Sequence, residues 1–416
     1  MESNHFLNTI ENFRRVAEKC QIHPDLIERL SRPRETVKIC LTPLMSDGRV
    51  HIHTAYIAQH NRALGPAKGG IRMAPSVTLD DISALAMEMT WKTSLIGVPF
   101  GGGKSGIVAD PESLSPQDKE ILIRSFTRSA IRHIGPEIYI PAPDMGTNER
   151  DMGHIRDCIS YSSGISVTRG CYVTGKPVLC GGIPGRREAT GKGVAITVGL
   201  ASRLLGIDLA QARVAIQGFG NVGAVAAQEL FRRGLKIIAL ADIHGTIWNP
   251  SGLDVDGIQE HLRGGNSLAT FPGSEPIPSS ELFSLDCDIL VPAASSNQIT
   301  PANAENIKAR LIAEGANGPT TPEADQILRK KGIFIIPDIL CNAGGVFVSY
   351  LEYTQETQRE QMTVEEVENR LQQRLEKCFE EVFSNARAGN VDMRSAALEI
   401  AIRRVADAIV CHGFYP

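Results

Sequence analysis

The stretch Gly218-Phe219-Gly220-Asn221-Val222-Gly223 decides the fold prediction. It directly follows a short apolar run at residues 214–216 and opens a segment with helical spacing at residues 222–231. Between a strand and a helix, the first glycine permits a tight turn, the second lets the backbone approach a pyrophosphate, and the third allows close helix packing. The helix N-terminus then attracts the phosphates. We predict a dinucleotide-binding site that includes Gly218, Gly220 and Gly223; the alternative is a glycine-rich turn of purely structural use.

Asp242 follows the next apolar run, residues 236–241, and lies 19 positions beyond Gly223. An acidic side chain there can accept hydrogen bonds from the adenosine ribose and repel a 2′-phosphate, which favours NAD over NADP. No Lys or Arg lies between Asp242 and Asn249, in agreement with this preference. A basic residue from elsewhere in the fold would still admit NADP, and Asp242 is alternatively a turn residue before Gly245.

Beyond this motif, short apolar runs alternate with helical segments through the second half of the chain. The runs are residues 214–216, 236–241, 288–293, 311–313 and 333–336. Each is short enough to be a buried parallel strand, and the alternation is typical of a doubly wound α/β sheet. We expect the Pro- and Ser-rich segment 271–280 to interrupt it as a surface loop.

The first 180 residues follow a different pattern, in which helical spacing alternates with strand-like spacing. A hairpin is expected around Asp47-Gly48, and helices around residues 79–89 and 121–131. This half is predicted to form an α+β or α/β unit of its own. The length of 416 residues agrees, because it exceeds what one hydrophobic core usually supports.

Composition excludes several classes of protein. The net charge of −4 provides no diffuse positive field for nucleic acid or an anionic membrane surface. Apolar stretches fall far short of the ~18 residues of a membrane-spanning helix, and the N-terminus lacks the pattern of a secretory signal, so we expect a cytoplasmic protein. The nine scattered cysteines are expected to be reduced, mostly buried thiols, and no His/Cys/Asp cluster has metal-ligand spacing.

Three lysines stand among glycines or apolar residues: Lys68 before Gly69-Gly70, Lys92 after Trp91, and Lys104 after Gly101-Gly102-Gly103. Glycine removes side-chain bulk, so a ligand can lie against the backbone while the ammonium reaches it. Three such lysines suggest an anionic substrate. Burial would lower the pKa of an ammonium and suit it to proton transfer or activation of water; the alternative is three unrelated surface lysines.

Asp144 follows the rigid run Pro141-Ala142-Pro143. A carboxylate fixed near a lysine ammonium is a plausible acid-base partner. An N-cap or turn aspartate is an equally good interpretation of this residue alone.

Together these motifs resemble the Glu/Leu/Phe/Val dehydrogenase family, in family order from about residue 12 to the C-terminus. The segments that carry the resemblance are residues 59–61, 68–72, 89–92, 101–104, 141–144, 174–177, 188–191, 218–223, 314–324 and 342–346. So many ordered matches are highly specific.

The resemblance implies roles residue by residue. Lys104 matches the lysine that activates the attacking water, and Asp144 the carboxylate that moves protons to and from the amino group. Lys92 matches the ligand of the substrate α-carboxylate, and Lys68 and Ser349 the pair that holds a glutamate side-chain carboxylate. Residues matching the rest of the substrate and cofactor sites are Gly69 and Met89 for substrate, and Thr190, Asn221, Val222, Asn317 and Asn342 for cofactor.

Four places depart from the family pattern. Met73-Ala74-Pro75-Ser76 replaces a more usual aromatic-His-Pro-acid run, and Tyr139 stands where a polar residue is common. His154 stands where many relatives have tryptophan, and Arg187 precedes Glu188 where small or acidic residues are usual. None is in the matched catalytic set, but Met73 and Arg187 bear on substrate preference and coenzyme choice.

We therefore predict an α/β enzyme of two domains with catalysis in the cleft between them. Residues 1–185, with C-terminal helices at about 365–416 packing back, would bind substrate and mediate assembly; residues 186–364 would form a Rossmann-like dinucleotide-binding domain. The implied reaction is reversible NAD(P)-dependent oxidative deamination of L-glutamate to 2-oxoglutarate and ammonia, without a metal, by a homohexamer. The alternatives are a dehydrogenase of leucine, valine or phenylalanine type and a non-catalytic regulatory paralogue.

Overall fold

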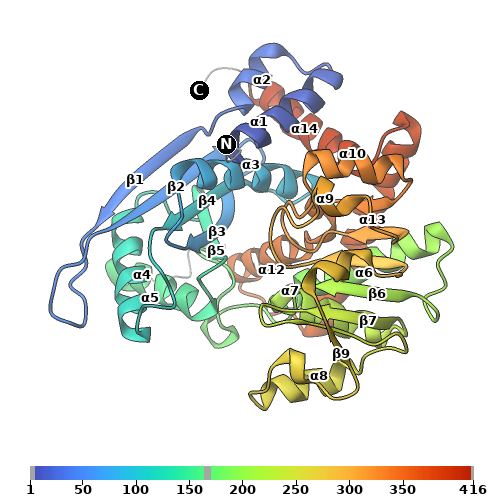
Figure 1. Cartoon of the computed structure of the whole chain (residues 1–416). Helices are drawn as coiled ribbons and strands as arrows, with labels where there is room; N and C mark the ends of the chain where they lie inside the picture. Colours follow the sequence, from blue (N-terminus) through green and yellow to red (C-terminus); the bar gives the residue numbers. More distant parts are fainter. Residues whose placement is uncertain (1–4, 164–169, 414–416) are drawn as a thin grey trace. The chain divides into compact units, whose positions relative to one another are not determined.

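The computed structural model describes residues 5–163 and 170–413, which divide into two compact units (Figure 1). Unit 1 comprises Met1–Arg186, Val346–Val367 and Leu398–Pro416, and unit 2 comprises Arg187–Gly345 and Glu368–Ala397. The division differs from the predicted one in two places, because Val346–Val367 belongs to unit 1 and Glu368–Ala397, with most of the helix after residue 364, belongs to unit 2. Its apolar side chains Phe383 and Ala386 line a cavity together with Phe334 of that unit. Helical periodicity shows that a face is buried, but it does not show what covers that face.

Unit 1 contains a five-stranded mixed sheet of order β1-β2-β4-β3-β5. β1 and β2 form the expected hairpin around Asp47-Gly48, and β3 pairs in parallel with both β4 and β5. The strands are β1 Glu35–Leu41, β2 His53–Asn61, β3 Ala67–Met73, β4 Gly101–Ile107 and β5 Tyr139–Pro143. The parallel strands β3, β4 and β5 are therefore neighbours in the sheet.

Helices cover both faces of this sheet. α3 (Leu79–Ile96) packs on the face that includes Ala58, while α4 (Pro116–Ala130) and α5 (Glu149–Ser163) pack side by side on the face that includes Ile57 (Figure 1). Adjacent strand residues point to opposite faces, so the two buried layers follow directly from the sequence of β2. Both α3 and α4 coincide with the helical spacing predicted from the sequence.

Among its described residues, unit 1 contains four further α-helices, of which α1 and α14 contact α3. These are α1 (His5–Lys19), α2 (Pro24–Leu30), most of α12 (Gly344–Gln358) and the end of α14 (Met393–His412). Phe13 of α1 stacks on Trp91 of α3 with ring centroids 5.1 Å apart, and the Ser94 hydroxyl donates to the Ala401 carbonyl at 2.8 Å. α3 is thus held between the sheet and helices from both ends of the chain.

Unit 2 contains a seven-stranded sheet of order β12-β11-β10-β6-β7-β8-β9. All five predicted apolar runs form its parallel strands, and the chain order reverses between β6 and β10. The strands are β6 Arg213–Gln217, β7 Lys236–Ala241, β8 Thr246–Trp248, β9 Glu275–Ile277, β10 Ile289–Pro292, β11 Leu311–Ala313 and β12 Phe334–Ile336. Ligands of such sheets bind at the carboxyl ends of the strands beside this reversal.

One segment of unit 2 was predicted incorrectly. Residues 271–280 are not only a loop, because residues 275–277 form β9, which pairs antiparallel with β8 at the sheet edge. Pro276 within a three-residue run hides the strand from sequence patterns, yet proline is tolerated at a sheet edge, where one side of the strand makes no ladder hydrogen bonds.

Several helices of unit 2 pack against its sheet and contribute side chains to its hydrophobic core. η4 (Ser279–Ser284), α9 and α10 contribute to one buried cluster with β6, β7, β10 and β11, and α6 and α7 also pack against strands. The α-helices are α6 Ala189–Leu205, α7 Asn221–Arg232, α8 Val255–Arg263, α9 Pro301–Ala304, α10 Pro322–Lys330, α11 Asp338–Cys341 and α13 Val364–Gly389. The short connections between these elements match the doubly wound pattern expected from the sequence.

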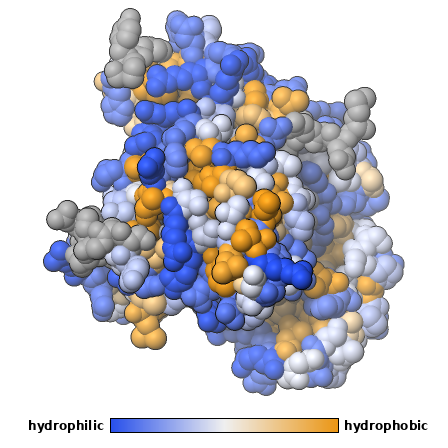
Figure 2. Space-filling view, turned by 90° about the vertical axis from the view of Figure 1, so that its left-hand side faces the viewer, coloured by the Kyte–Doolittle hydropathy of each residue, from blue (hydrophilic) through white to orange (hydrophobic). Residues whose placement is uncertain are grey.

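Within residues 5–163 and 170–413, no helix is long and apolar enough to cross a bilayer, and no three His, Cys, Asp or Glu side chains form a group able to hold a metal ion. All nine cysteines are free thiols, and six of them are buried, as predicted. Exposed apolar side chains of unit 1 include Leu44, Val50 and Ile52 of the β1–β2 connection. Figure 2, which views the β1 side of the molecule, shows apolar side chains gathered on part of this face. Such patches often mark contacts with another chain.

Candidate active site

Lys104 and Asp144 lie in direct contact in unit 1. β4 carries Lys104, and Asp144 follows β5. The Lys104 Nζ atom is 2.9 Å from Asp144 Oδ2, and Arg72 Nε of β3 is 3.1 Å from the same oxygen. The Lys104 side chain is 5% exposed and that of Asp144 is 20% exposed. The structure therefore brings together an ammonium and a carboxylate that lie 40 residues apart in the sequence.

The two cations determine the ionisation of Asp144. Burial alone would raise the pKa of this carboxyl, but Lys104 first and Arg72 second outweigh burial and bring it to about 2. Gly70 of β3 makes the approach possible, because a Cβ atom there would lie 2.6 Å from the Asp144 Cβ. Asp144 is consequently an ionised proton acceptor at neutral pH.

Lys68 lies on β3, paired in register with Gly102 of β4. Its side chain is among the largest fully buried ones in the protein. Burial first and the Arg186 guanidinium second lower the pKa of Lys68 to about 7, against the opposing effects of Cys171 and Glu352. Lys68 is therefore buried and not a surface lysine, while its role toward a substrate stays a prediction.

Arg186 was not among the predicted site residues. Its Nε donates to the Ser349 Oγ at 2.7 Å, and its charge acts on Lys68, so Arg186 connects the two predicted side-chain ligands. Ser349 is 1% exposed. The available signal was its position in Pro184-Gly185-Arg186, one residue before the Arg187 noted as unusual. Arg187 itself is exposed.

α3 presents Met89 and Lys92 toward the protein interior. A Cβ atom on Gly69 would lie 3.4 Å from the Met89 Cγ, so the methionine packs over the backbone of β3 beside Lys68. Lys92, three residues further along the helix, is 8% exposed. α3 is fixed at its start by a capping box between Thr78 and Asp81.

Lys176, Glu352 and Glu356 form a network of ion pairs near Ser349 and Arg186 in unit 1. Lys176 Nζ is 2.6 Å from Glu352 Oε1 and 2.9 Å from Glu356 Oε2, and the Gly175 amide donates to Glu352 Oε2 at 2.8 Å. Glu352 lies one turn after Ser349 on α12. The network ties the segment before Arg186 to the helix that carries Ser349.

The residues that depart from the family pattern lie outside these contacts. The Tyr139 hydroxyl is within 2.8 Å of Ser105 Oγ and donates to the Gly69 carbonyl at 3.2 Å, so the ring supports β3 and β4 from within the sheet core. Met73 is buried, and His154 lies 3.7 Å from Glu120. Tyr139 is therefore satisfied as a buried polar residue, although a polar side chain is more common there.

In unit 2 the glycine motif joins β6 to α7, as predicted. Gly218 has a φ of +95°, and a Cβ atom on Gly223 would lie 1.7 Å from the Gly218 carbonyl oxygen. Gly220 is the N-cap of α7, and a Cβ atom there would have nothing within 4 Å. The helix start is thus open to a ligand, at the point where the order of the parallel strands reverses.

The other predicted cofactor residues gather around the start of α7. A Cβ atom on Gly191, next to Thr190, would lie 2.7 Å from the Val222 carbonyl, and one on Gly315 would lie 3.4 Å from a Val222 methyl. The Asn342 Nδ2 donates to Asn317 Oδ1 at 3.1 Å. Thr190, Asn317 and Asn342 therefore converge from three segments, while Asn221 is exposed as the first residue of α7.

An unpaired oxygen suggests what this end of the sheet binds. Asn342 is 7% exposed, and its Oδ1 atom has no hydrogen-bond partner within the described part of the chain. A buried acceptor of this kind needs a donor. The amide group of a nicotinamide supplies one, so the residues present fit a nicotinamide dinucleotide.

Asp242 lies at the carboxyl end of β7 and is partly exposed. Its Oδ1 accepts from the amides of His244 and Gly245 at 2.7 and 3.0 Å. The carboxylate therefore shapes the turn and at the same time stands at the strand end where a ribose would lie. The interpretation of Asp242 as a turn residue is confirmed, and its contact with a coenzyme ribose stays a prediction.

Comparison with known proteins agrees with this geometry. Residues 181–413 match the family model described as Glutamate/Leucine/Phenylalanine/Valine dehydrogenase, and residues 33–161 match the Glu/Leu/Phe/Val dehydrogenase dimerisation domain. The chain belongs to the Glutamate/Leucine/Phenylalanine/Valine dehydrogenase family. It is therefore an enzyme, an amino-acid dehydrogenase, and members of this family use nicotinamide dinucleotides.

Similar proteins cover the whole chain. The Glutamate dehydrogenase of Thermotoga maritima is 47% identical over 98% of both chains, and the NAD-specific glutamate dehydrogenase of Staphylococcus aureus is 40% identical over 99% of both. Among solved structures, the hetero-hexameric glutamate dehydrogenase of Thermus thermophilus in its Leu-bound form has a TM-score of 0.94 and 35% identity, covering 100% of this chain and 99% of that one. The family resemblance predicted from the sequence is confirmed.

Proposed function

We propose that this chain is a glutamate dehydrogenase, which catalyses the reversible oxidative deamination of L-glutamate to 2-oxoglutarate and ammonia. The observation that carries the proposal is the contact between buried Lys104 and partly buried Asp144, 2.9 Å apart, in the unit that also buries Lys68. A proton acceptor and an ammonium in contact suit chemistry at an amino-bearing carbon. The names of the relatives support the same reaction.

The substrate would be bound by unit 1 through its two carboxylates. Lys68, Ser349 and Arg186 would hold the side-chain carboxylate, and Lys92 would hold the α-carboxylate, with Gly69 and Met89 beside the substrate. In a dehydrogenase of leucine or valine, Lys68 and Arg186 would face hydrocarbon and remain unpaired, which is costly for buried cations. Their presence favours glutamate over the apolar amino acids.

Lys104 and Asp144 would perform the proton transfers. Asp144 begins as a carboxylate, since its pKa is about 2, and can accept a proton from the substrate ammonium. Lys104 would promote the attack of water on the iminium carbon. Asp144 would then return its one proton to the nitrogen, so that the C–N bond breaks and ammonia leaves, while the two protons of the attacking water pass to solvent as the ketone forms.

Unit 2 would hold the coenzyme. Gly218, Gly220 and Gly223 with Asn221 and Val222 would hold the pyrophosphate at the start of α7, and Thr190, Asn317 and Asn342 would surround the nicotinamide. When bound, the nicotinamide accepts the hydride from the substrate Cα.

NAD is the proposed coenzyme, with NADP as the alternative. Asp242 places a carboxylate at the end of β7, where it would accept from the ribose and repel a 2′-phosphate. No lysine or arginine follows it before Asn249. The relative named as NAD-specific supports the same preference.

We further propose a cytoplasmic homohexamer. The free state of the nine cysteines supports a reducing compartment. The edge position of β1 and the exposed side chains of Leu44, Val50 and Ile52 support burial against another chain. Light scattering of the purified protein would give the number of subunits.

The test is the oxidation of reduced coenzyme by purified protein with 2-oxoglutarate and ammonium, followed by absorbance with NADH and NADPH in parallel. Faster turnover with NADH than NADPH is expected. 2-Oxoisocaproate and phenylpyruvate serve as competing substrates. Faster turnover with either of these than with 2-oxoglutarate would show that the substrate is an apolar amino acid. If folded, assembled protein oxidises no coenzyme with any of the 2-oxo acids, the regulatory alternative is favoured.

A further inference from the structure

One arginine in unit 2 contacts three acidic residues that have no role in the proposed reaction. Arg394 is the second residue of α14. Its guanidinium lies 2.6 Å from Glu314, 3.1 Å from Asp325 and 3.5 Å from Asp338. These acids come from the end of β11, from α10 and from the first position of α11. A single side chain therefore joins four elements.

The position of Arg394 is not explained by its own helix. A cation in the first turn of a helix opposes the helix dipole. The ion pair with Glu314, whose side chain is 0% exposed, compensates for this unfavourable interaction with the helix dipole. Burial raises the pKa of Glu314, and Arg394 is the strongest influence that lowers it. Without Arg394, Glu314 would be a buried carboxylate with no cationic partner among the contacts described.

A chain of hydrogen bonds leads from this cluster to the loop that bears Asn317. Glu314 Oε2 accepts from the Asp338 amide at 2.9 Å, and Asp338 Oδ2 accepts from the Gly318 amide at 2.8 Å. From the other end of α11, Asn342 donates to the Ala316 carbonyl at 3.1 Å. The loop at residues 315–318 is therefore held from both ends of one short helix, and Glu314 fixes the first of these ends.

We propose that Arg394 is a positioning residue for coenzyme binding, which acts by holding Glu314 and Asp338 so that the loop bearing Asn317 keeps its place. The inference rests on the proposed coenzyme-binding role of Asn317 and Asn342. Among the residues that the structure describes, the polar contacts of Arg394 are with Glu314, Asp325 and Asp338 and include neither the proposed substrate residues nor the glycine motif.

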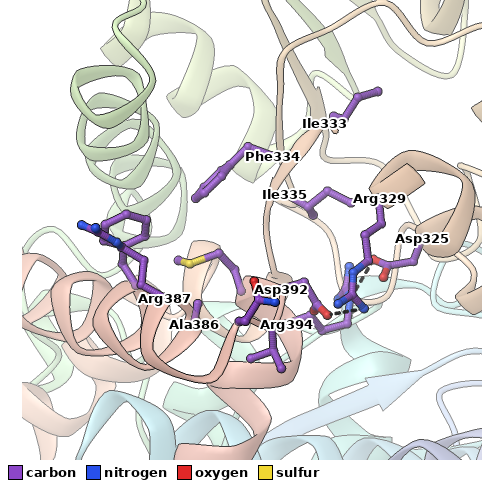
Figure 3. A pocket seen from close by; sticks show the side chains of 13 residues that line it. Asp325, Arg329, Ile333, Phe334, Ile335, Ala386, Arg387, Asp392 and Arg394 are labelled. Atoms are coloured by element: carbon purple, nitrogen blue, oxygen red, sulfur yellow. Dashed lines mark hydrogen bonds and ion pairs between the residues drawn. The ribbon is translucent and has the colours of Figure 1, made fainter. Parts of the chain in front are cut away.

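The surroundings of Arg394 make the proposal testable by substitution. Arg394 lines a cavity of about 290 Å³ between β12, α10 and the turn from α13 to α14 (Figure 3). A replaced side chain therefore has free space beside it. The same cavity offers a matched control, because Arg329 pairs with Asp392 at 2.8 Å, is 55% exposed and does not contact Glu314.

The experiment compares NADH binding, by fluorescence titration, with the KM for 2-oxoglutarate in the assembled protein. Arg394→Gln is expected to weaken NADH binding about tenfold while the KM for 2-oxoglutarate changes by less than about twofold. Arg394→Lys, which keeps the cation, should recover part of the affinity. Arg394→Gln combined with Glu314→Gln should also recover part of the affinity, since the fully buried side chain at position 314 then carries no unpaired charge. Arg329→Gln should bind NADH as the wild type does.

The outcomes separate this inference from the proposed function. Wild-type protein that binds neither NADH nor NADPH would overturn both. Wild-type binding with unchanged affinity in Arg394→Gln would overturn only the inference, as would an equal loss in Arg329→Gln. If Arg394→Gln does not fold, Arg394→Lys and the double variant are compared in its place. If NADH affinity, the KM for NADH and the KM for 2-oxoglutarate all change together in these variants, with no selective loss for NADH, Arg394 has only a structural role and the inference is overturned.

Discussion

Replacing Lys68 by methionine should raise the stability of the free protein and lower its activity. The buried Lys68 ammonium lowers the free energy of unfolding of the substrate-free protein, and a bound substrate carboxylate would compensate for this. Methionine keeps the length of the side chain and removes its charge. The pKa of Lys68 falls from its usual 10.5 to about 7, and one pKa unit corresponds to about 1.4 kcal/mol. The difference sets an upper bound of about 5 kcal/mol on the free energy by which the buried ammonium destabilises the fold.

The sign of the effect depends on pH. Below about pH 7 the folded protein carries the buried ammonium, so the cost is present in full. Between about pH 7 and 10.5 the folded protein has lost this proton while the unfolded chain retains it, so the wild-type fold gains stability. Lys68→Met bears no such cost. It should therefore melt several degrees above the wild type at pH 6, and the difference should shrink as the pH rises to 9.

Activity should change in the opposite direction. A hydrogen bond to a charged group is worth about 1.5–3 kcal/mol, so kcat/KM for glutamate should fall roughly 100-fold, with Arg186 retaining part of the binding. The assays are calorimetric melting at pH 6 and 9 and steady-state kinetics with glutamate and norvaline, with the exposed Lys236→Met as control. A variant that melts below the wild type at pH 6, or that keeps glutamate turnover, would refute the reasoning.

Three further substitutions test other parts of the site. Lys104→Ala should lose turnover by several orders of magnitude while NADH titration shows unchanged binding, and retained turnover would remove Lys104 from the mechanism. Gly223→Ala should abolish NADH binding and lower the melting temperature, since its Cβ would lie 1.7 Å from the Gly218 carbonyl oxygen; normal binding would show that the turn adapts. Asp242→Ser should raise kcat/KM with NADPH relative to NADH, and an unchanged ratio would assign Asp242 to the turn alone.

Local patterns predicted the parts of the fold that are determined within one element. The five parallel strands of unit 2 and the turn at Gly218 to Gly223 each depend on neighbours a few residues away. The sequence therefore shows them directly. The strand at residues 275–277 escaped because its pairing with β8 is a contact between segments, and its own composition resembles a loop.

The candidate site was predicted where glycine marks it. Lys68 and Lys104 stand beside glycines, and Gly70 lies where the backbone must admit Asp144. Glycine in a strand has a reason that can be recognised before the structure is known, since a close approach leaves no room for a side chain. Lys92, on a helix without glycine neighbours, was identified by its apolar surroundings and by the family resemblance.

Arg186 and Arg394 escaped because little near them in the sequence distinguishes them from surface arginines; Arg186 has only its place after Pro184-Gly185 as a signal. Arg186 meets Ser349 across 163 residues, and Arg394 meets Glu314 across 80. Each is explained only by the buried partner that it finds after folding, because an acid or hydroxyl without a donor would be costly in the interior. A partly buried arginine of this kind therefore has to be identified from its contacts in the structure. We therefore expect Arg186 to act on Lys68, the proposed substrate lysine, and Arg394 to act on the proposed coenzyme loop, so that substitution of either arginine should weaken binding of one ligand and leave binding of the other unchanged.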